Sequence, residues 1–247
     1  MRVRNLDITR VDGPDLSDAD FDAFMALRGQ FMQLRADVDP AEDRRRVEAW
    51  LRAPGCSVAL GHDRAGKLQT LIEMNGRRVE FGGRSHVVWT SNHIFAAREY
   101  RKHPANTLGN FMNLGALVRR LGVRDGVSLI AALYPPSYIT AIRAIPRLWI
   151  VGTGDAPPEL DALAQHAAGE AFGESWLPGP RLIRMRTVPE DLVPRSAEGR
   201  ALLARYETHN PSWREGYGVL VVTPLSVVNL AGIASQLALR TVTGKGR

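Results

Sequence analysis

A β-rich run, a basic turn, an amphipathic helix and a second β-rich run follow one another between residues 86 and 133. The first run covers residues 86–97, and the second, 127–133, is apolar enough to be buried. Apolar residues recur with helical spacing over 108–121, and Gly122 ends that helix. The pattern therefore predicts a strand, a basic turn, a helix and a buried strand in this order.

The flanking sequence predicts helices around a mostly antiparallel sheet. Ser17 is a favourable helix N-cap before apolar residues that continue to Leu34, and Asp39-Pro40 predicts a second helix start. Asn75-Gly76 predicts a hairpin between two short strands. Further strands are expected at 56–60, 68–74, 78–81, 148–151, 182–186 and 218–222, and further helices at 138–145, 157–171, 196–209 and 226–239.

These elements predict an α/β (α+β) fold class in a single domain. Residues 1–152 are expected to form its core, and residues 153–247 a C-terminal extension packed on that core. With 247 residues and 45% hydrophobic content, the chain is long and apolar enough to bury such a core.

Composition also limits the classes of function. A single cysteine, Cys56, excludes a disulfide framework and suits a reducing compartment. The sequence shows neither the early apolar segment of a signal peptide nor an apolar run long enough to span a membrane. We therefore expect a cytoplasmic protein. Its six histidines show no metal-ligand spacing, so no metal is expected. The net charge of +6 attracts anions, but with 7% aromatic residues and no recognition motif, nucleic acid is not an expected partner.

Two segments carry a family resemblance: "FAAREYRKHPANTLGNFMNLGALVRRLG" and "YITAIRAIPRLWIVGTG". In the first, Glu99, Tyr100 and Arg101 match a turn that precedes a helix in the GCN5-related N-acetyltransferase (GNAT) superfamily. With the order of elements over residues 17–152, the chain resembles a divergent GNAT member, akin to N-acyl amino acid synthases. The resemblance implies a GNAT-like mixed, mostly antiparallel sheet flanked by helices. Within this sheet it implies two parallel β-segments that open as a wedge beside the turn at residues 98–107.

The resemblance implies an N-acyltransferase that moves an acyl group from an acyl-thioester to an amine by direct attack in a ternary complex. The co-substrate is expected to be acyl-CoA or a phosphopantetheine-linked acyl group on an acyl carrier protein, with no permanently bound cofactor. The amine acceptor is an amino acid, a peptide or a small molecule. Pro104 and Asn106 stand where the family's phosphate loop has small residues. These departures leave open a non-catalytic GNAT-like protein that binds a lipid, an acyl-thioester or a partner protein.

The predicted donor site combines the basic turn with the strand before it. Amides at a helix N-terminus bind phosphate oxygens, and basic side chains strengthen that binding. The residues expected there are Arg101, Lys102, His103, Ala105, Asn106 and Thr107. A backbone amide near Ile94 or Phe95 is expected to polarise the thioester carbonyl, as the resemblance implies.

Four side chains are candidates for proton transfer. His93 and Glu73 are candidate bases, against the alternatives of a hydrogen-bonded core histidine and an exposed strand residue. Ile145 stands where many GNAT enzymes carry a tyrosine that protonates the leaving thiolate, so Tyr134 and Tyr138 are the candidate substitutes. The apolar residues of 226–239 suit core packing, with acyl-pocket lining, a dimer interface or peripheral membrane contact as alternatives. The oligomeric state stays open.

Overall fold

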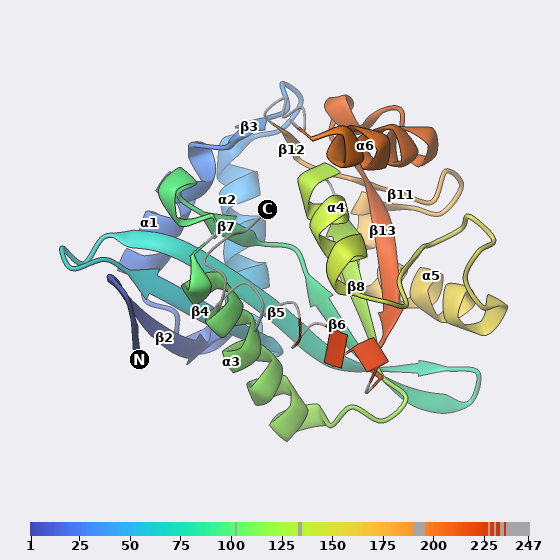
Figure 1. Cartoon of the computed structure of the whole chain (residues 1–247), viewed down its shortest axis with the longest axis horizontal. Helices are drawn as coiled ribbons and strands as arrows, with labels where there is room; N and C mark the ends of the chain where they lie inside the picture. Colours follow the sequence, from blue (N-terminus) through green and yellow to red (C-terminus); the bar gives the residue numbers. More distant parts are fainter. Residues whose placement is uncertain are drawn as a thin grey trace.

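The computed structural model describes residues 1–101, 103–132, 135–189 and 196–226, together with residues 228, 229, 231, 232 and 235. Most of the strands form one large twisted sheet, and helices flank it (Figure 1). The helices are α1 (Asp18–Gly29), α2 (Pro40–Leu51), α3 (Pro104–Leu121), α4 (Pro135–Ala144), α5 (Pro158–Phe172) and α6 (Ala197–His209).

The large sheet has the strand order β1-β2-β4-β5-β6-β8-β13-β11-β10, with β7 paired to β5 and β9 paired to β13. Its pairs are antiparallel except for the parallel pair β6–β8, so the predicted fold class is confirmed. The strands are β1 (Arg2–Val3), β2 (Leu6–Asp12), β4 (Cys56–His62), β5 (Leu68–Phe81), β6 (Arg84–Ser91), β7 (Ile94–Ala96), β8 (Val127–Ala132), β9 (Trp149–Ile150), β10 (Trp176–Leu177), β11 (Leu182–Arg184) and β13 (Tyr217–Pro224).

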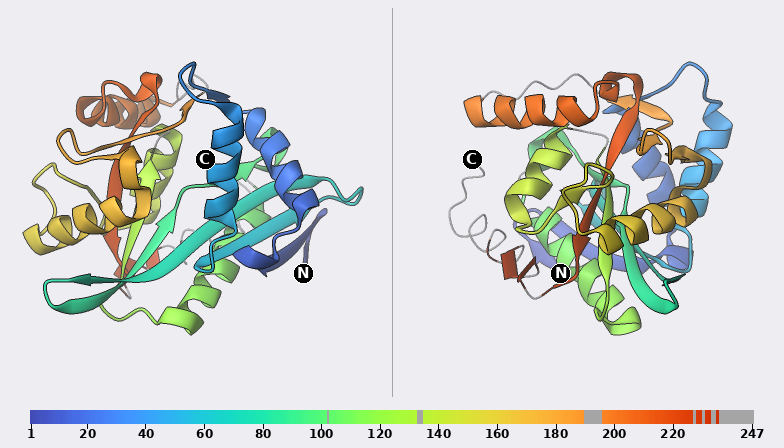
Figure 2. Two further views of the ribbon diagram at one scale, coloured as in Figure 1. Left: turned by 180° about the vertical axis from the view of Figure 1, so that it is seen from behind. Right: turned by 90° about the vertical axis from the view of Figure 1, so that its right-hand side faces the viewer.

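Helices cover both faces of the sheet. α3 and α4 lie on one face, and α1, α2 and α5 lie on the other, as the opposite views in Figures 1 and 2 show. Alternate residues of β13 pack on different sides: Leu220 joins the cluster around α5, and Val219 joins the one around α4 and α6. Strands from the predicted extension, β10, β11 and β13, are part of the same sheet as β4 and β5.

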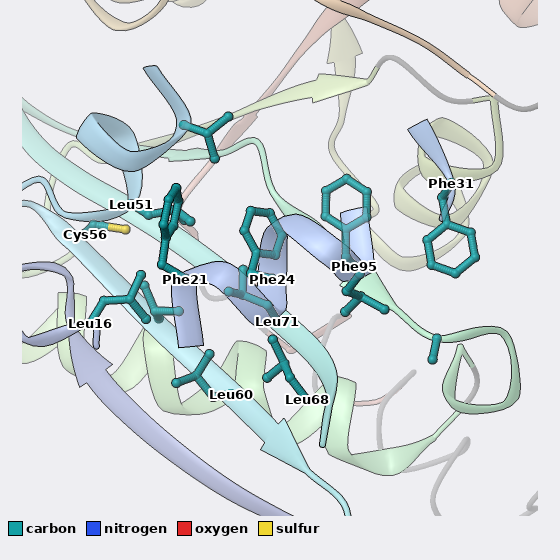
Figure 3. Close-up of a cluster of buried hydrophobic side chains, with 14 residues drawn as sticks. Leu16, Phe21, Phe24, Phe31, Leu51, Cys56, Leu60, Leu68, Leu71 and Phe95 are labelled. Atoms are coloured by element: carbon teal, nitrogen blue, oxygen red, sulfur yellow. The ribbon is translucent and has the colours of Figure 1, made fainter. Parts of the chain in front are cut away.

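The core between α1, α2 and the sheet positions the site described below. Figure 3 shows Phe21 and Phe24 of α1 lying over Leu71 of β5 and Phe95 of β7. The Phe24 and Phe95 rings meet edge to face, with centroids 5.6 Å apart. Cys56 is buried here, and burial raises the pKa of its thiol, as expected for a packed residue rather than a nucleophile.

The predicted hairpin at Asn75-Gly76 is wrong. Both residues lie inside β5, and the chain reverses at Gly82-Gly83, where φ is +57° and +72°. Packing explains the glycine at 76, because a Cβ there would lie 2.8 Å from the Leu121 side chain of α3. Gly76 therefore lets α3 approach the sheet, and the glycine pair supplies the left-handed turn.

The prediction of helix to Leu34 is also wrong, because α1 ends at Gly29 and residues 32–34 form a strand. This strand, β3 (Met32–Leu34), pairs antiparallel with β12 (Thr187–Pro189) in a small second sheet. The pairing joins two segments that are far apart in the sequence. Among the described residues, no helix has both the length and the apolarity needed to cross a membrane. The predicted helix 226–239, with its membrane contact, lies largely outside those residues.

Candidate active site

The sheet opens at the end of the parallel pair. β6 and β8 keep their register from Val88 opposite Val127 to Ser91 opposite Ile130. The chain is then irregular at Asn92 and His93, and β7 pairs with β5 but not with β8. The described parts of β7 and β8 are therefore unpaired with each other, and Figure 1 shows them apart. The two strands therefore separate where the resemblance implies a wedge, and we call this separation the wedge.

Glu73 of β5 holds the irregular segment in place. Its Oε1 accepts hydrogen bonds from the Asn92 and His93 amides, the latter at 2.7 Å. The Ser91 hydroxyl donates to the Glu73 carbonyl at 2.9 Å. The carboxylate is fully buried, and no described residue forms a hydrogen bond of normal geometry with its Oε2. Burial raises the pKa of Glu73 to about 7, although the two amides and Trp50 partly oppose the rise.

The hydrogen-bond alternation of the β5–β7 ladder sets the direction of the Ile94 amide. The Glu73 amide donates to the His93 carbonyl at 3.1 Å, and Ala97 N–H donates to the Gln69 carbonyl at 2.8 Å. Ile94, opposite Ile72, is then a non-hydrogen-bonded position, whose N–H faces away from β5. That direction is the gap beside β8. The Phe95 amide faces β5 instead, so of the two predicted amides only that of Ile94 is available in the wedge.

His93 lies in an aromatic environment at the same place. Its ring centroid is 5.8 Å from that of Phe24, 6.5 Å from Trp50 and 6.4 Å from Phe95. Within the described part of the chain, no group hydrogen-bonds the His93 ring. Burial, with a smaller contribution from the Arg28 charge, lowers the pKa of His93 to about 3. The imidazole is therefore neutral at physiological pH.

A cleft of about 560 Å³ extends from this point over the α2 face of the sheet. His93, Asn92 and Phe95 line it together with Trp50 of α2 and the turn after α5. The Trp50 ring stacks on Phe172 with centroids 5.9 Å apart, which joins α2 to α5 across the cleft. A small molecule in this cleft would reach the irregular segment from the side of α1 and α2.

A buried ion pair fixes one wall of the cleft. Arg28 donates to both carboxylate oxygens of Asp43, at 2.6 and 3.3 Å, and Arg186 lies 3.4 Å from the same carboxylate. Asp43 is 1% exposed. A single carboxylate therefore ties together α1, α2 and the segment before β12.

The basic turn differs from the predicted phosphate site in one respect. His103 caps α3: its Nδ1 accepts the Ala105 amide at 3.2 Å, and its carbonyl accepts the Asn106 amide at 3.1 Å. Pro104 has no amide hydrogen. The Ala105 and Asn106 amides at the start of α3 therefore donate to His103, whereas the predicted phosphate site needs them for a ligand. Burial and the Arg4 charge lower the pKa of His103, so its ring adds no positive charge.

The remaining donor-site candidates lie around this turn. The Asn106 side chain donates to the Tyr100 carbonyl at 2.7 Å, and Thr107 is half-buried in the first helical turn. Arg101 is exposed, and its guanidinium lies 4.7 Å from the Phe31 ring centroid. Lys102 lies outside the described residues.

Of the two candidate tyrosines, Tyr138 packs between helices and not beside the irregular segment. Tyr138 is 1% exposed and packs on Tyr206 of α6, with ring centroids 5.4 Å apart. Burial raises the pKa of Tyr138. Tyr134 lies outside the described residues. Among those residues, no group of three or more His, Cys, Asp or Glu side chains is placed to hold a metal ion.

Comparison with known proteins gives likeness in structure alone. No protein-family model matches the chain, and no curated protein matches its sequence. A similar solved structure is aminoglycoside 6'-N-acetyltransferase AAC(6')-Ih from Acinetobacter baumannii, at 15% identity and a TM-score of 0.41, over 56% of this chain and 86% of that one.

Two further similar structures are also named as transferases. One is a ribosomal-protein-alanine N-acetyltransferase from Brucella melitensis, at 12% identity and a TM-score of 0.40, over 55% of this chain and 87% of that one. The other is a probable N-acyltransferase from Enterococcus faecalis, at 15% identity and a TM-score of 0.41, over 62% of this chain and 36% of that one. With likeness at this level, the function has to be inferred from this chain's own residues.

Several residues of the cleft were absent from the sequence-based prediction. Arg28 and Asp43 show no local signal, because they meet only when α1 packs on α2. Arg77 does show a local signal in the sequence. Glu73, Asn75 and Arg77 occupy every second position along β5 and therefore share a face of the sheet.

Proposed function

We propose that the chain is an N-acyltransferase that transfers an acyl group from an acyl-thioester to an amine. One observation carries the proposal: the parallel pair β6–β8 ends at Ser91 and Ile130, and the next two residues of the chain, Asn92 and His93, line the cleft. A thioester arm in the wedge and an amine in the cleft would meet at the irregular segment 92–93. Holding two reactants in one orientation supplies much of the rate of such a reaction.

In the proposed reaction, the amine nitrogen attacks the thioester carbonyl carbon. The Ile94 amide, directed into the wedge, hydrogen-bonds the carbonyl oxygen as it gains negative charge. The tetrahedral intermediate then collapses: the C–S bond breaks, an amide forms, and the thiolate leaves. Tyr138 takes no part in the proposal because it is packed between α4 and α6.

Glu73 is the proposed acceptor of the proton that the amine loses. A carboxylate with a pKa of about 7 is suited to take a proton near neutral pH, and within the described chain its Oε2 forms no hydrogen bond of normal geometry. Trp50 lines the cleft and also interacts with this carboxylate, so it lies on the route between amine and base. His93, neutral and at the cleft wall, is proposed to orient the amine as a hydrogen-bond acceptor.

The α3 turn supports a donor whose phosphate is held by side chains. Because the Ala105 and Asn106 amides are engaged with His103, exposed Arg101 is the described residue best placed to meet a phosphate. A phosphopantetheine arm has one phosphodiester and makes a smaller demand on amides than the pyrophosphate of coenzyme A. The net charge of +6 also suits an acidic carrier protein. We therefore propose an acyl carrier protein as the preferred donor over acyl-CoA.

Thiol release tests this function. The purified chain is incubated with acyl-CoAs or acyl carrier proteins of several chain lengths, each with a panel of amines, and free thiol and amide product are measured. We expect turnover, with Arg101→Ala raising the KM for the donor. Arg64→Ala is the matched control, since it removes an exposed charge from the turn between β4 and β5. Absence of both turnover and thioester binding would exclude the proposal.

The second candidate is a non-catalytic protein that binds an acyl-thioester, a lipid or a partner protein. It is favoured by the α3 amides that are already engaged, and by the Glu73 carboxylate, which occupies two amides of the irregular segment. The same assay separates the two candidates, because binding without product formation supports this one and multiple turnover excludes it.

A further inference from the structure

The arginines that line the cleft are paired with carboxylates, with one exception. Arg28 lies within 4.0 Å of Asp43, Arg46 of Glu42 and Glu174, Arg184 of Asp37, and Arg186 of Glu42 and Asp43. Arg77 of β5 also lines the cleft, and within the described chain no carboxylate lies within that distance of it. Among the described residues of the cleft, Arg77 is therefore the arginine without a carboxylate in direct contact, although the charge of the nearby Glu170 acts on it.

The Arg77 guanidinium is held in a fixed position. It donates to the Ala167 carbonyl at 2.9 Å and to the Glu170 carbonyl at 3.1 Å, both near the C-terminal end of α5. Within the described chain its Nε has no hydrogen-bond partner, and burial lowers the pKa of the group, although the Glu170 charge partly opposes the fall. The carbonyl end of a helix offsets only part of a unit charge. A half-buried cation that donates to neutral carbonyl groups is stabilised further by a carboxylate in direct contact.

Arg77 also has a defined place relative to the reacting groups. Glu73, Asn75 and Arg77 lie on one face of β5, and four residues of strand separate the first from the last by about 13 Å. Asn75 and Arg77 line the same cleft as Asn92 and His93. A ligand that places an amine at the irregular segment thus points its far end along β5 toward Arg77.

We infer that the acyl acceptor is an amine with a carboxylate at its far end, and that Arg77 binds this carboxylate. The inference rests on the proposed acyl transfer and names the substrate class of that site. A carboxylate accepts charge-assisted hydrogen bonds from the guanidinium, whose hydrogen-bond partners within the described chain are the backbone carbonyls of Ala167 and Glu170. The apolar wall formed by Trp50 and Phe172 packs against the methylene groups between the two ends.

The test uses ω-amino carboxylates with two, four, six and eight carbon atoms, each compared with its uncharged carboxamide. Using the acyl donor that gives turnover, we expect wild-type kcat/KM to favour the carboxylate at least about tenfold at the preferred length. Arg77→Gln is expected to abolish this preference, and Arg77→Lys to reduce it. Arg78→Gln is the control: Arg78 is exposed and donates to the Leu121 carbonyl on the opposite face, so its loss should leave the ratio unchanged.

The outcomes separate this inference from the proposed function. If no amine of any kind is acylated, the proposed function fails. If uncharged amines are acylated as well as the carboxylates by the wild-type chain, acyl transfer stands and the inference is overturned. The comparison of carboxylates with carboxamides in the wild-type chain tests the inference even if Arg77→Gln does not fold. Calorimetric binding of the best carboxylate without donor is a second measurement, in which Arg77→Gln should weaken binding about tenfold or more.

Discussion

Replacing Glu73 with glutamine gives a direct test of the buried carboxylate beneath the wedge. The side chain is 0% exposed, and burial raises its pKa from 4.5 to about 7. Folding therefore favours the protonated carboxyl group. Glutamine keeps an oxygen that can accept the Asn92 and His93 amides, but it does not titrate. The substitution therefore isolates the effect of ionisation from the effect of shape.

The sign and size of the effect follow from the two pKa values. Because the folded-state pKa is the higher one, the contribution of Glu73 to stability is fully present below pH 4.5 and is lost as the pH rises through 7. The difference between the two values corresponds to about 3 kcal/mol, at 1.36 kcal/mol per pH unit. The free energy of unfolding of the wild type, minus that of Glu73→Gln, should therefore fall by about 3 kcal/mol between pH 4.5 and pH 8.

Urea unfolding followed by tryptophan fluorescence at pH 4.5, 6, 7 and 8 measures this difference. Taking the difference between the two proteins cancels every other titrating group they share. Glu80→Gln, an exposed position on the same strand, is the control and should show no such trend. A wild-type minus Glu73→Gln difference that stays constant within about 0.5 kcal/mol would refute the reasoning, because Glu73 would then titrate alike in the folded and unfolded chain.

Three further substitutions test the surroundings of the site. His93 has a folded-state pKa of about 3, below its ordinary 6.5, so the wild type should lose about 2 kcal/mol relative to His93→Phe as the pH falls from 6.5 to 5, measured by urea unfolding. Asp43→Asn should cost about 3–5 kcal/mol at pH 7, since it leaves a buried charge uncompensated; a loss below about 1 kcal/mol would contradict the ion pair. Gly109→Ala should lower the midpoint of thermal unfolding, because its Cβ would lie 2.9 Å from Ile72, whereas Gly115→Ala on the same helix has room and should raise it.

Local signals in the sequence predicted where the first two helices begin. Ser17 caps α1 by accepting the Asp20 amide at 3.1 Å, and Asp39 caps α2 by accepting the Ala41 amide at 3.1 Å. These caps depend on residues two or three positions apart, so a sequence shows them directly. The order of strand, turn, helix and strand across residues 86–133 was likewise predictable, because hydrophobic period and glycine position mark each element.

Features that depend on distant contacts were not predictable in the same way. Asn75-Gly76 has the composition of a hairpin turn, but the approach of α3 decides its conformation. Met32–Leu34 continues a helical pattern, yet it pairs with a strand over 150 residues later. The charge of Arg77 becomes informative only when every other arginine of the cleft has a carboxylate beside it. The available amide at Ile94 likewise required the register of the ladder.

The position of β13 within the sheet has a consequence for how the chain is made. This strand lies between β8 and β11, although β8 ends at Ala132 and β13 begins only at Tyr217. During synthesis, the backbone N–H and C=O groups on one edge of β8 therefore stay unpaired until residues 217–224 have left the ribosome. A truncation before this point would leave that edge open to other chains, so aggregation of nascent or nicked protein is expected to begin at β8.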